Sequence, residues 1–273
     1  MRDLKNKDLV IFDLETTGLD PKGGDRICEI AAIKFKNDNL AGSFNTLVDP
    51  GRPVSAAAFA VNHIDEKMLK GAPRAAEILP KFIDFLSGSY VASYNIRFDL
   101  NFLQNELKII NKKLDPGLMF FDVLTLARRT LLNLPSYSLA NVSRGLGIGT
   151  VQVHRAYSDV EMTWQVYNSL VSILKERGIR QFKEIYTICG FNAELLGQAN
   201  EQKIAFILRA IDFHFDISIR YFSKNVAEVT ERKVSPEEIY EENGKKYLVG
   251  YCHLRKSERN FAIDSILHLD VEE

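Results

Sequence analysis

Cysteine is scarce in this chain. The three cysteines, Cys28, Cys189 and Cys252, lie far apart, are odd in number and form no CxxC pair. This excludes a disulfide framework, gives no indication of a zinc site and is typical of a chain kept in a reducing compartment. We therefore expect a cytoplasmic protein.

Long hydrophobic runs are also missing. No segment approaches the roughly 20 apolar residues that a membrane-spanning helix needs, and the opening residues, MRDLKNKDLVIF, lack the apolar stretch of a signal peptide. We expect no membrane partner. The 46% apolar content of the 273 residues is nevertheless ample for one large domain or two ordinary ones.

A strong charge of either sign is absent, since the net charge is -1. The balance differs along the chain: residues 1–190 hold 24 Lys and Arg against 21 Asp and Glu, a net charge of +3, and residues 191–273 hold 11 against 15, a net charge of -4. A general basic field for nucleic acid is excluded. We expect any phosphate-binding surface to be local and to lie in the first part of the chain.

The stretch DLVIFDLETTGLD at residues 8–20 is the most informative segment present. Its apolar run predicts a buried strand that ends at a Thr-Thr-Gly turn. Asp13 and Glu15 are two residues apart in that strand, so their side chains point to the same face. Two such carboxylates favour a hard divalent cation, Mg²⁺ or Mn²⁺. The alternative is that Asp13 caps the turn and Glu15 is solvated.

The rest of the first part alternates between strand and helix patterns. Two further strands at 27–36 and 43–49 are followed by helical spacing over 55–70 and 74–88. A strand at 89–95 then precedes a helix, and another at 118–122 precedes further helices. This alternation predicts an α/β sheet with helices packed on it.

Three more polar residues fall where such sheets assemble their sites. Asp99 and Asp159 lie in the first turns of two predicted helices, and His154 lies just before the second of them. Each has an ordinary alternative, because a carboxylate favours a helix N-terminus and a loop histidine is commonly a surface or capping residue. Together with Asp13 and Glu15, they provide the carboxylates and the base that two-metal phosphodiester cleavage requires.

Three motifs then carry a family resemblance over about residues 8–175. IFDLETTGLD resembles the first motif of the DEDDh (DnaQ-like) 3′-5′ exonucleases, YNIRFDLNFL the second, and HRAYSDVEMT the third. His154 stands five residues before Asp159 and Arg155 stands four before it, as in the histidine branch of that superfamily. The resemblance implies an RNase H-like mixed sheet with flanking helices.

The resemblance also implies roles for these residues. Asp13 is expected to bridge two Mg²⁺ or Mn²⁺ ions, Glu15 and Asp159 to complete the site of the ion that activates water, and Asp99 to hold the second ion, directly or through waters. His154 is the implied general base. All five are thus the implied catalytic residues.

A pocket for the terminal nucleotide is implied next to the first two motifs. Its expected residues are Thr16, Thr17, Gly18, Leu19, Asn95 and Phe98. Turn chemistry and core packing are the alternative roles of these residues, above all for Phe98. One departure is Tyr94, where the family often has histidine, and it puts the substrate preference in doubt.

The chain after about residue 200 has a different pattern. A helix over 201–213 and alternating segments at 215–222, 226–234, 246–254 and 259–269 predict a small, mainly-β barrel of the Sm or SH3 type. This part resembles a WYL domain, with Lys246 in place of the name-giving tryptophan and Ala262 and Ser265 where arginines are common. The expected division is therefore an exonuclease domain at 1–178, a linker at 179–200 and a WYL-like domain at 201–273.

The role of this last part stays open between ligand sensing and packing or dimerisation. Its polar candidates for a ligand site are Arg220, Tyr247, His253 and Arg255, each of which also fits an ordinary surface or barrel position.

The leading hypothesis is a metal-dependent exonuclease that releases nucleoside 5′-monophosphates from DNA or RNA 3′ ends, with single-stranded nucleic acid as its partner. The alternative is a non-cleaving nucleic-acid-binding or regulatory protein whose WYL-like domain senses a ligand. A third hypothesis, proofreading in trans, adds a DNA polymerase or another replication or repair protein as a partner.

Overall fold

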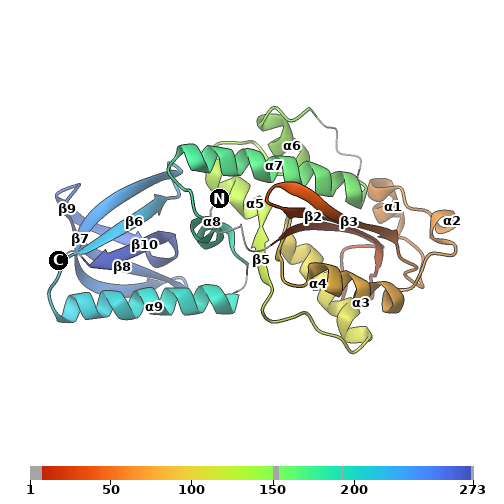
Figure 1. Ribbon diagram of the computed structural model, residues 1–273, viewed down its shortest axis with the longest axis horizontal. Coiled ribbons are helices and arrows are strands. Elements are labelled where there is room, and N and C mark those ends of the chain that lie inside the picture. The colour runs from red at the N-terminus through yellow and green to blue at the C-terminus, as the bar shows by residue number, and fades with distance from the viewer. Residues whose placement is uncertain (1–7, 150–153, 192, 272–273) are drawn as a thin grey trace.

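A computed structural model describes residues 8–149, 154–191 and 193–271, with the side chains of 193–199 left out of the description. Two sheets make up the framework (Figure 1). The first lies in the N-terminal part and is flanked by helices, and the second lies near the C-terminus.

The first sheet has the order β3-β2-β1-β4-β5. Its strands are β1 Leu9–Thr16, β2 Ile27–Lys36, β3 Asn39–Leu47, β4 Tyr90–Ser93 and β5 Met119–Asp122. β1 pairs antiparallel with β2 and parallel with β4, so the sheet is mixed. Because β1 and β4 run in the same direction, their carboxyl ends meet at one edge of the sheet.

The alternation of β1 sends its side chains into two separate cores. Leu9 and Ile11 belong to a core under one group of helices, whereas Val10, Phe12 and Leu14 belong to the core on the other face. Asp13 and Glu15 continue the series of Leu9 and Ile11. The pleat of the strand therefore aims both acids at the first group of helices.

Helices cover both faces of this sheet. The core that contains Ile11 is closed by residues of α5 Val123–Thr130, α6 Leu139–Gly145, α7 Ala156–Glu176 and α8 Phe182–Cys189. The opposite core is closed by α3 Ala75–Leu86 and α4 Ile96–Ile109. Figure 1 shows α7 lying along the sheet above β2 and β3.

The predicted helix over 55–70 is two short helices, α1 Ala56–Asn62 and α2 Glu66–Leu69. His63 ends α1 in the left-handed region with φ 57°, and the Asp65 carboxylate caps the backbone N–H of Met68 to start α2. The spacing of apolar residues does not reveal such a break, because a single left-handed residue ends a helix without changing the amino-acid composition around it.

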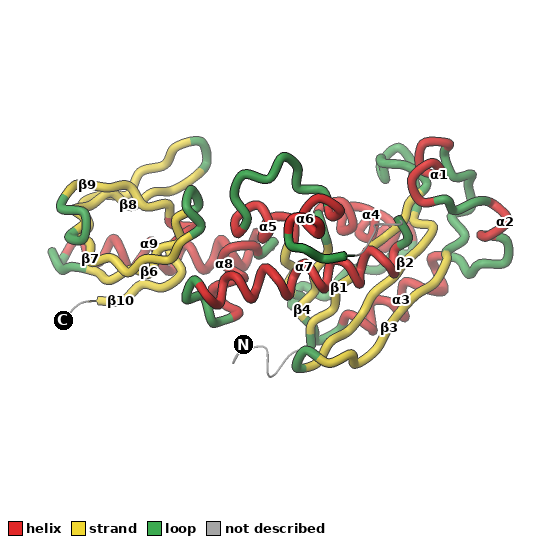
Figure 2. The backbone as a smooth tube through the Cα atoms, turned by 90° about the horizontal axis from the view of Figure 1, so that it is seen from above, coloured by secondary structure: helices red, strands yellow, loops and turns green. Residues whose placement is uncertain are grey.

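The second sheet is antiparallel throughout, with the order β10-β6-β7-β8-β9. The C-terminal elements are α9 Ala193–Asp212, β6 Ile217–Ser223, β7 Glu228–Glu242, β8 Lys245–Cys252, β9 Ser257–Ala262, η2 Ile263–Ser265 and β10 Ile266–Val271. The stretch predicted as one strand over 259–269 is thus split by the 3₁₀ turn η2. Pro236 lies inside β7 at a register shift, a position where the missing N–H is tolerated. Figure 2 shows how strongly this sheet curves.

The fold class predicted from the sequence is confirmed: a mixed α/β sheet with flanking helices precedes a small, mainly-β part. No helix within the described parts of the chain combines the length and apolar character that crossing a membrane requires. Cys28, Cys189 and Cys252 are buried and free.

The segment between the two sheets contains packed helices. Phe182 and Ile185 of α8 join the core above the first sheet, and so do Phe222 and Leu267 of the second sheet. An Arg220–Glu184 ion pair links β6 to α8 in addition. The division at residues 178 and 201 stays a prediction. The second sheet has a core of its own, and these contacts show that a few of its residues also pack into the core above the first sheet.

Candidate active site

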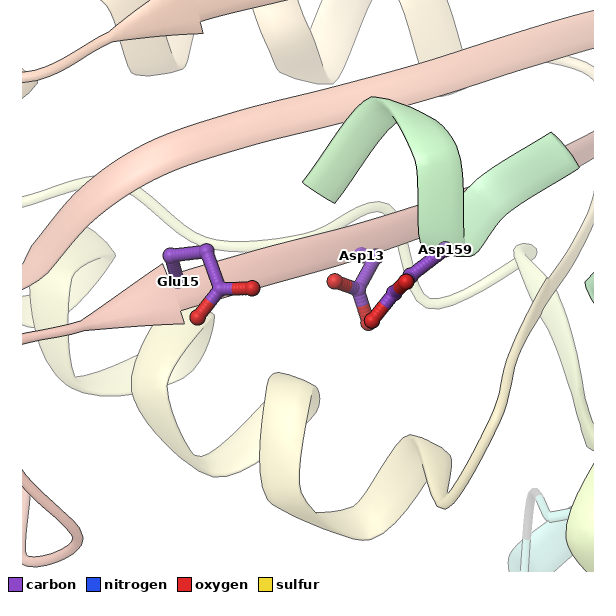
Figure 3. Close-up of side chains that lie close together, drawn as sticks. All are labelled: Asp13, Glu15 and Asp159. Atoms are coloured by element: carbon purple, nitrogen blue, oxygen red, sulfur yellow. The ribbon is translucent and has the colours of Figure 1, made fainter. Parts of the chain in front are cut away.

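Asp13 and Glu15 lie near the carboxyl end of β1, on the face covered by α7. In the antiparallel pairing of β1 with β2, Asp13 lies opposite Ala31 and Glu15 lies opposite Glu29. Asp159 comes to the same place from α7, where it lies in the first turn of the helix. One carboxylate oxygen from each of Asp13, Glu15 and Asp159 lies within 4.8 Å of the other two (Figure 3).

An ion pair between the half-exposed Arg155 and the buried Glu29 holds α7 against the sheet at this point. Arg155 donates two hydrogen bonds to the Glu29 carboxylate, at 3.1 and 2.6 Å, and the backbone N–H of Ala156 donates a third, at 3.1 Å. Glu29 is only 2% exposed and directly faces Glu15 across the strand pair. This clamp fixes the start of α7, and with it the position of Asp159.

Asp99 approaches the cluster from the first turn of α4 and is buried. Ser93 at the end of β4 donates a hydrogen bond of 2.5 Å to its carboxylate. Asp99 stands outside the group of three, but its charge acts on Asp13 more strongly than any other. It therefore lies on the Asp13 side of the cluster.

His154 is placed differently from the acids. It is exposed, has φ 51° and lies two residues before α7 begins. Among the described residues, the clustered ligand atoms come from Asp13, Glu15 and Asp159, and His154 is not one of their group. The structure thus brings three of the five predicted catalytic residues together. Asp99 is a neighbour of these three, and His154 lies just before the first residue of α7.

The crowding of acids disturbs their protonation. Burial, followed by the charges of Asp99, Glu15 and Asp159, raises the pKa of Asp13 well above its usual range. Burial and then the charge of Asp159 raise the pKa of Glu15 to about 8. Burial raises the pKa of Asp99 to about 7, against the hydrogen bond from Ser93.

A divalent cation fits this cluster. Buried carboxylates that repel one another are stabilised when a positive charge lies between them, and hard oxygen ligands favour Mg²⁺ or Mn²⁺. The donor set contains carboxylate oxygens only, from Asp13, Glu15 and Asp159, which suits those ions better than zinc.

Three polar residues that the sequence patterns do not single out support these acids: Glu29, Ser93 and Asn62. Asn62, buried at the end of α1, acts to lower the pKa of Glu15 and donates a hydrogen bond to the backbone carbonyl of Thr16 at 3.2 Å. The only sequence signal is a single acid or amide inside an apolar stretch, such as Glu29 in ICEIAAI. That signal indicates a buried partner without saying which one.

The predicted nucleotide pocket begins at the turn after β1. Thr16 and Thr17 are buried, and the Thr17 hydroxyl donates to Asp25 at 3.2 Å. A Cβ at Gly18 would overlap the Asp25 carboxylate, so a larger residue there would displace that side chain. Leu19, by contrast, is 83% exposed and is free to meet a ligand.

Asn95 and Phe98 lie at the start of α4. Asn95 is exposed, has a left-handed φ of 67° and donates its backbone N–H to Asp122 at 3.0 Å. Phe98 is half-buried, with its ring centroid 5.0 Å from that of Phe102. One face of the Phe98 ring thus packs against Phe102, as expected if Phe98 serves core packing.

The four C-terminal candidates have different neighbours. Arg220 pairs with Glu184 and donates to the Gly178 carbonyl at 2.8 Å, so it holds the two parts of the chain together. Tyr247 stacks on Tyr240, and His253 lies 2.8 Å from the Ser235 hydroxyl. Arg255 lies in the exposed turn after β8. A ligand role for these four stays a prediction.

Comparison with known proteins agrees with this geometry. Residues 10–167 match the family model described as "Exonuclease", and residues 202–271 match the model of the WYL domain. A PolC-type DNA polymerase III of Thermotoga petrophila is 36% identical over 181 residues, which are 66% of this chain and 13% of that protein. A DNA polymerase III subunit epsilon-like protein of Rhodobacter capsulatus is 36% identical over 195 residues, covering 70% of this chain and 27% of that protein.

Solved structures show the same fold. A zinc-bound complex of E. coli exonuclease I with single-stranded DNA aligns with 89% of this chain and 54% of that chain, at a TM-score of 0.60 and 18% identity. An exonuclease I from Methylocaldum szegediense aligns with 90% of this chain and 54% of that chain, at a TM-score of 0.57 and 20% identity. The chain spans between an eighth and about a quarter of the length of the two polymerase relatives named above.

Proposed function

Because this chain belongs to the exonuclease family, we propose that it is a metal-dependent 3′-5′ exonuclease that releases nucleoside 5′-monophosphates from DNA or RNA 3′ ends. The observation that carries the proposal is the convergence of Asp13, Glu15 and Asp159 within 4.8 Å at the carboxyl end of β1. The 3′-5′ direction is the one that the three sequence motifs imply.

Asp13, Glu15 and Asp159 would hold the metal, with Asp99 on the Asp13 side available for a second ion. When bound, Mg²⁺ or Mn²⁺ neutralises the phosphodiester charge and lowers the pKa of a water nucleophile. The raised pKa values of Glu15 and Asp99 support this assignment, because they show acids that a cation would stabilise in the ionised form.

The chain's own residues would supply orientation and proton transfer. We assign His154 as the base that takes a proton from the attacking water, because an imidazole titrates near neutral pH and this one is exposed beside the start of α7. Thr16, Thr17 and Gly18 form the turn that would contact the terminal nucleotide, and exposed Leu19 offers an apolar surface for its base.

The partner is proposed to be the 3′ end of a single-stranded nucleic acid. Two observations support this partner: the relatives bear the names of DNA polymerase III proteins, and the E. coli exonuclease I structure contains single-stranded DNA. A polymerase partner for proofreading in trans and a location in the cytoplasm are further proposals that rest on the same relatives and on the free cysteines.

The decisive experiment is a nuclease assay of the full chain on 5′-labelled single-stranded DNA and RNA with MnCl₂ or MgCl₂. We expect a ladder of shortened products that EDTA abolishes. Asp13→Asn is expected to lower the rate about 100- to 1,000-fold, since an electrostatic contact to the reacting charge is worth that much. Asp84→Asn, which changes an exposed acid on α3, is the matched control and should cleave at the wild-type rate.

Two outcomes would contradict the proposal. Folded protein that binds oligonucleotide tightly without metal and yields no product would support the non-cleaving, regulatory alternative. Cleavage that survives Asp13→Asn would locate the activity elsewhere or in a contaminant.

A further inference from the structure

A cavity of about 400 Å³ lies where the two parts of the chain meet. Its walls come from the start of α4, from α5, from the end of α8 and the residues after it, and from α9 and η2 near the second sheet. Volumes of a few hundred Å³ are typical of sites for small ligands. The cavity is separate from the carboxylate cluster, since neither Asp13, Glu15 nor Asp159 lines it.

Positive charge dominates this cavity. Its cationic lining residues are Arg97, Arg128, Arg129 and Lys203. Among the described residues, none of these four takes part in an ion pair within 4.0 Å, whereas eight other Lys and Arg residues do.

The two acids of the lining are already engaged. Asp264 receives two hydrogen bonds from the Lys224 ammonium, at 3.0 and 2.8 Å. Asp122 accepts from the backbone N–H groups of Asn95 and Ile96 and from the Thr125 hydroxyl, at 3.0, 3.2 and 2.6 Å. The four cations therefore keep a surplus of positive charge that these acids do not neutralise.

Lys203 extends from α9 and is half-buried. Among the described residues, its ammonium has two long contacts, 3.4 Å to the Asn200 side chain and 3.4 Å to the Ile263 carbonyl. Burial lowers the pKa of Lys203 to about 8, while Asp264 acts to raise it and Lys183 to lower it. A partly buried ammonium that lacks a close anionic partner is stabilised when an anion enters.

An aromatic side chain completes the site. Phe191 lines the cavity, and the Arg97 guanidinium lies 5.7 Å from its ring centroid. Cations beside an aromatic ring suit a ligand that has both a phosphate and a flat base, because the ring and the guanidinium stack on bases while the other cations pair with phosphate.

From this arrangement we propose that the cavity binds a free phosphate-bearing ligand of about the size of one nucleotide, held between Arg97, Arg128 and Arg129 of the first part and Lys203 of the second. The ligand would join the two parts of the chain. The same cavity is lined by Asp122, whose hydrogen bonds fix the start of α4 one turn before Asp99. The inference does not rest on nuclease activity, and its test is a binding measurement.

The test is calorimetric titration of the full-length chain with AMP, in EDTA so that the carboxylate cluster cannot recruit nucleotide through a metal. AMP is expected to bind saturably at one site per chain, inorganic pyrophosphate to compete with it, and adenosine, which lacks the phosphate, to bind at least 10-fold more weakly. Lys203→Met and Arg128→Gln are each expected to weaken AMP binding at least 10-fold. Lys81→Met, on the exposed face of α3, is the matched control and should bind as the wild type does.

Arg128 is exposed, so Arg128→Gln keeps the test decisive even if Lys203→Met fails to fold. The proposal is overturned if millimolar AMP and pyrophosphate do not bind, or if both variants bind AMP as tightly as the wild type. A third arm uses a dT10 oligonucleotide. Were the two variants to weaken dT10 binding while AMP does not bind at all, the cavity would be part of a path for a nucleic-acid strand, and the free-ligand proposal would fail.

Discussion

At the scale of single residues, the cluster is organised by acids that repel one another and by polar groups that hold them in place. Glu29 belongs to the second kind, since it receives three hydrogen bonds from Arg155 and Ala156 beside the half-buried Glu15. Its own negative charge also acts on Asp13 and Glu15. Glu29 therefore acts both on the position of Asp159 and on the charge that attracts a cation.

Glu29→Ala is expected to weaken Mn²⁺ binding about 10-fold or more, the range usual for groups that orient metal ligands. The free energy of unfolding is expected to fall by about 2 kcal/mol as the charged hydrogen bonds are lost. Calorimetric Mn²⁺ titration and urea unfolding measure the two effects. Glu176→Gln, at the exposed far end of α7, is the control and should change neither. Unaltered Mn²⁺ affinity in Glu29→Ala would refute the positioning role.

The pKa shifts of Glu15 and Asp99 predict how the metal-free protein responds to pH. Both values are raised above those of an unfolded chain, so the folded state binds protons more tightly. This contribution to stability is complete below about pH 4 and is lost as the pH rises to about 8, where the acids must ionise next to one another. In EDTA, the melting temperature should therefore fall between pH 5.5 and pH 8.

Saturating MnCl₂ should raise the melting temperature more at pH 8 than at pH 5.5, because the cation binds the ionised carboxylates. Glu15→Gln removes one titrating group and should flatten the dependence in EDTA. A melting temperature in EDTA that rises toward pH 8 in the wild type, and equally in Glu15→Gln, would show that the cluster does not govern this range.

At the scale of elements, short strands end in loops that deliver helix N-termini to one edge of the sheet. Asp122, the last residue of β5, is central to this arrangement. Its carboxylate caps α5 through Leu124 and Thr125 and also receives the N–H groups of Asn95 and Ile96 at the start of α4. One carboxylate thus fixes two helices, of which α4 carries Asp99.

Asp122→Ala is expected to lower the free energy of unfolding by about 2–3 kcal/mol, since two helix starts lose their acceptor. Nuclease activity should fall as well, because α4 carries Asp99. Asp65→Ala is the matched control: it removes the cap of α2 only, with an expected cost of about 1 kcal/mol and no loss of activity. Denaturant unfolding and the nuclease assay compare the two. Equal costs for both variants would show that Asp122 supports α5 alone.

At the scale of the whole molecule, the two sheets are joined through α8. Phe182 lies with its ring centroid 4.1 Å from Tyr90 and 5.7 Å from Phe121, both of the first sheet. The backbone N–H of Phe191 donates to Phe120 at 2.8 Å, so the chain after α8 covers the open edge of β5. Removing these residues would expose both an apolar surface and a strand edge.

A chain of residues 1–178 is therefore expected to be less stable than one of residues 1–191. Phe182 and Ile185, at 2% and 0% exposure, each contribute about 1.5–3 kcal/mol of burial. Thermal unfolding of the two shortened chains tests this, with aggregation measured by light scattering. Identical melting temperatures would mean that α8 packs on the first sheet without stabilising it.

The sequence by itself determined the elements and the acids. The alternation of β1 puts Asp13 and Glu15 on one face, and the motif spacing places Asp99 and Asp159 in first helical turns; both are local properties of a few neighbouring residues. Local patterns also explain why two breaks were not predicted, one between the helices α1 and α2 at His63 and one at the 3₁₀ turn η2. The apolar spacing continues through both breaks, because neither changes the composition.

Only the tertiary structure decided which residues support the site and where the two parts meet. The Arg155–Glu29 pair joins residues 126 positions apart, and the cavity gathers cations from α4, α5 and α9. Such contacts depend on how helices pack across the sheets, and a hydrophobic pattern specifies that a face is buried without specifying its partner. For the same reason, the free charge of Lys203 became visible only when its neighbours were known.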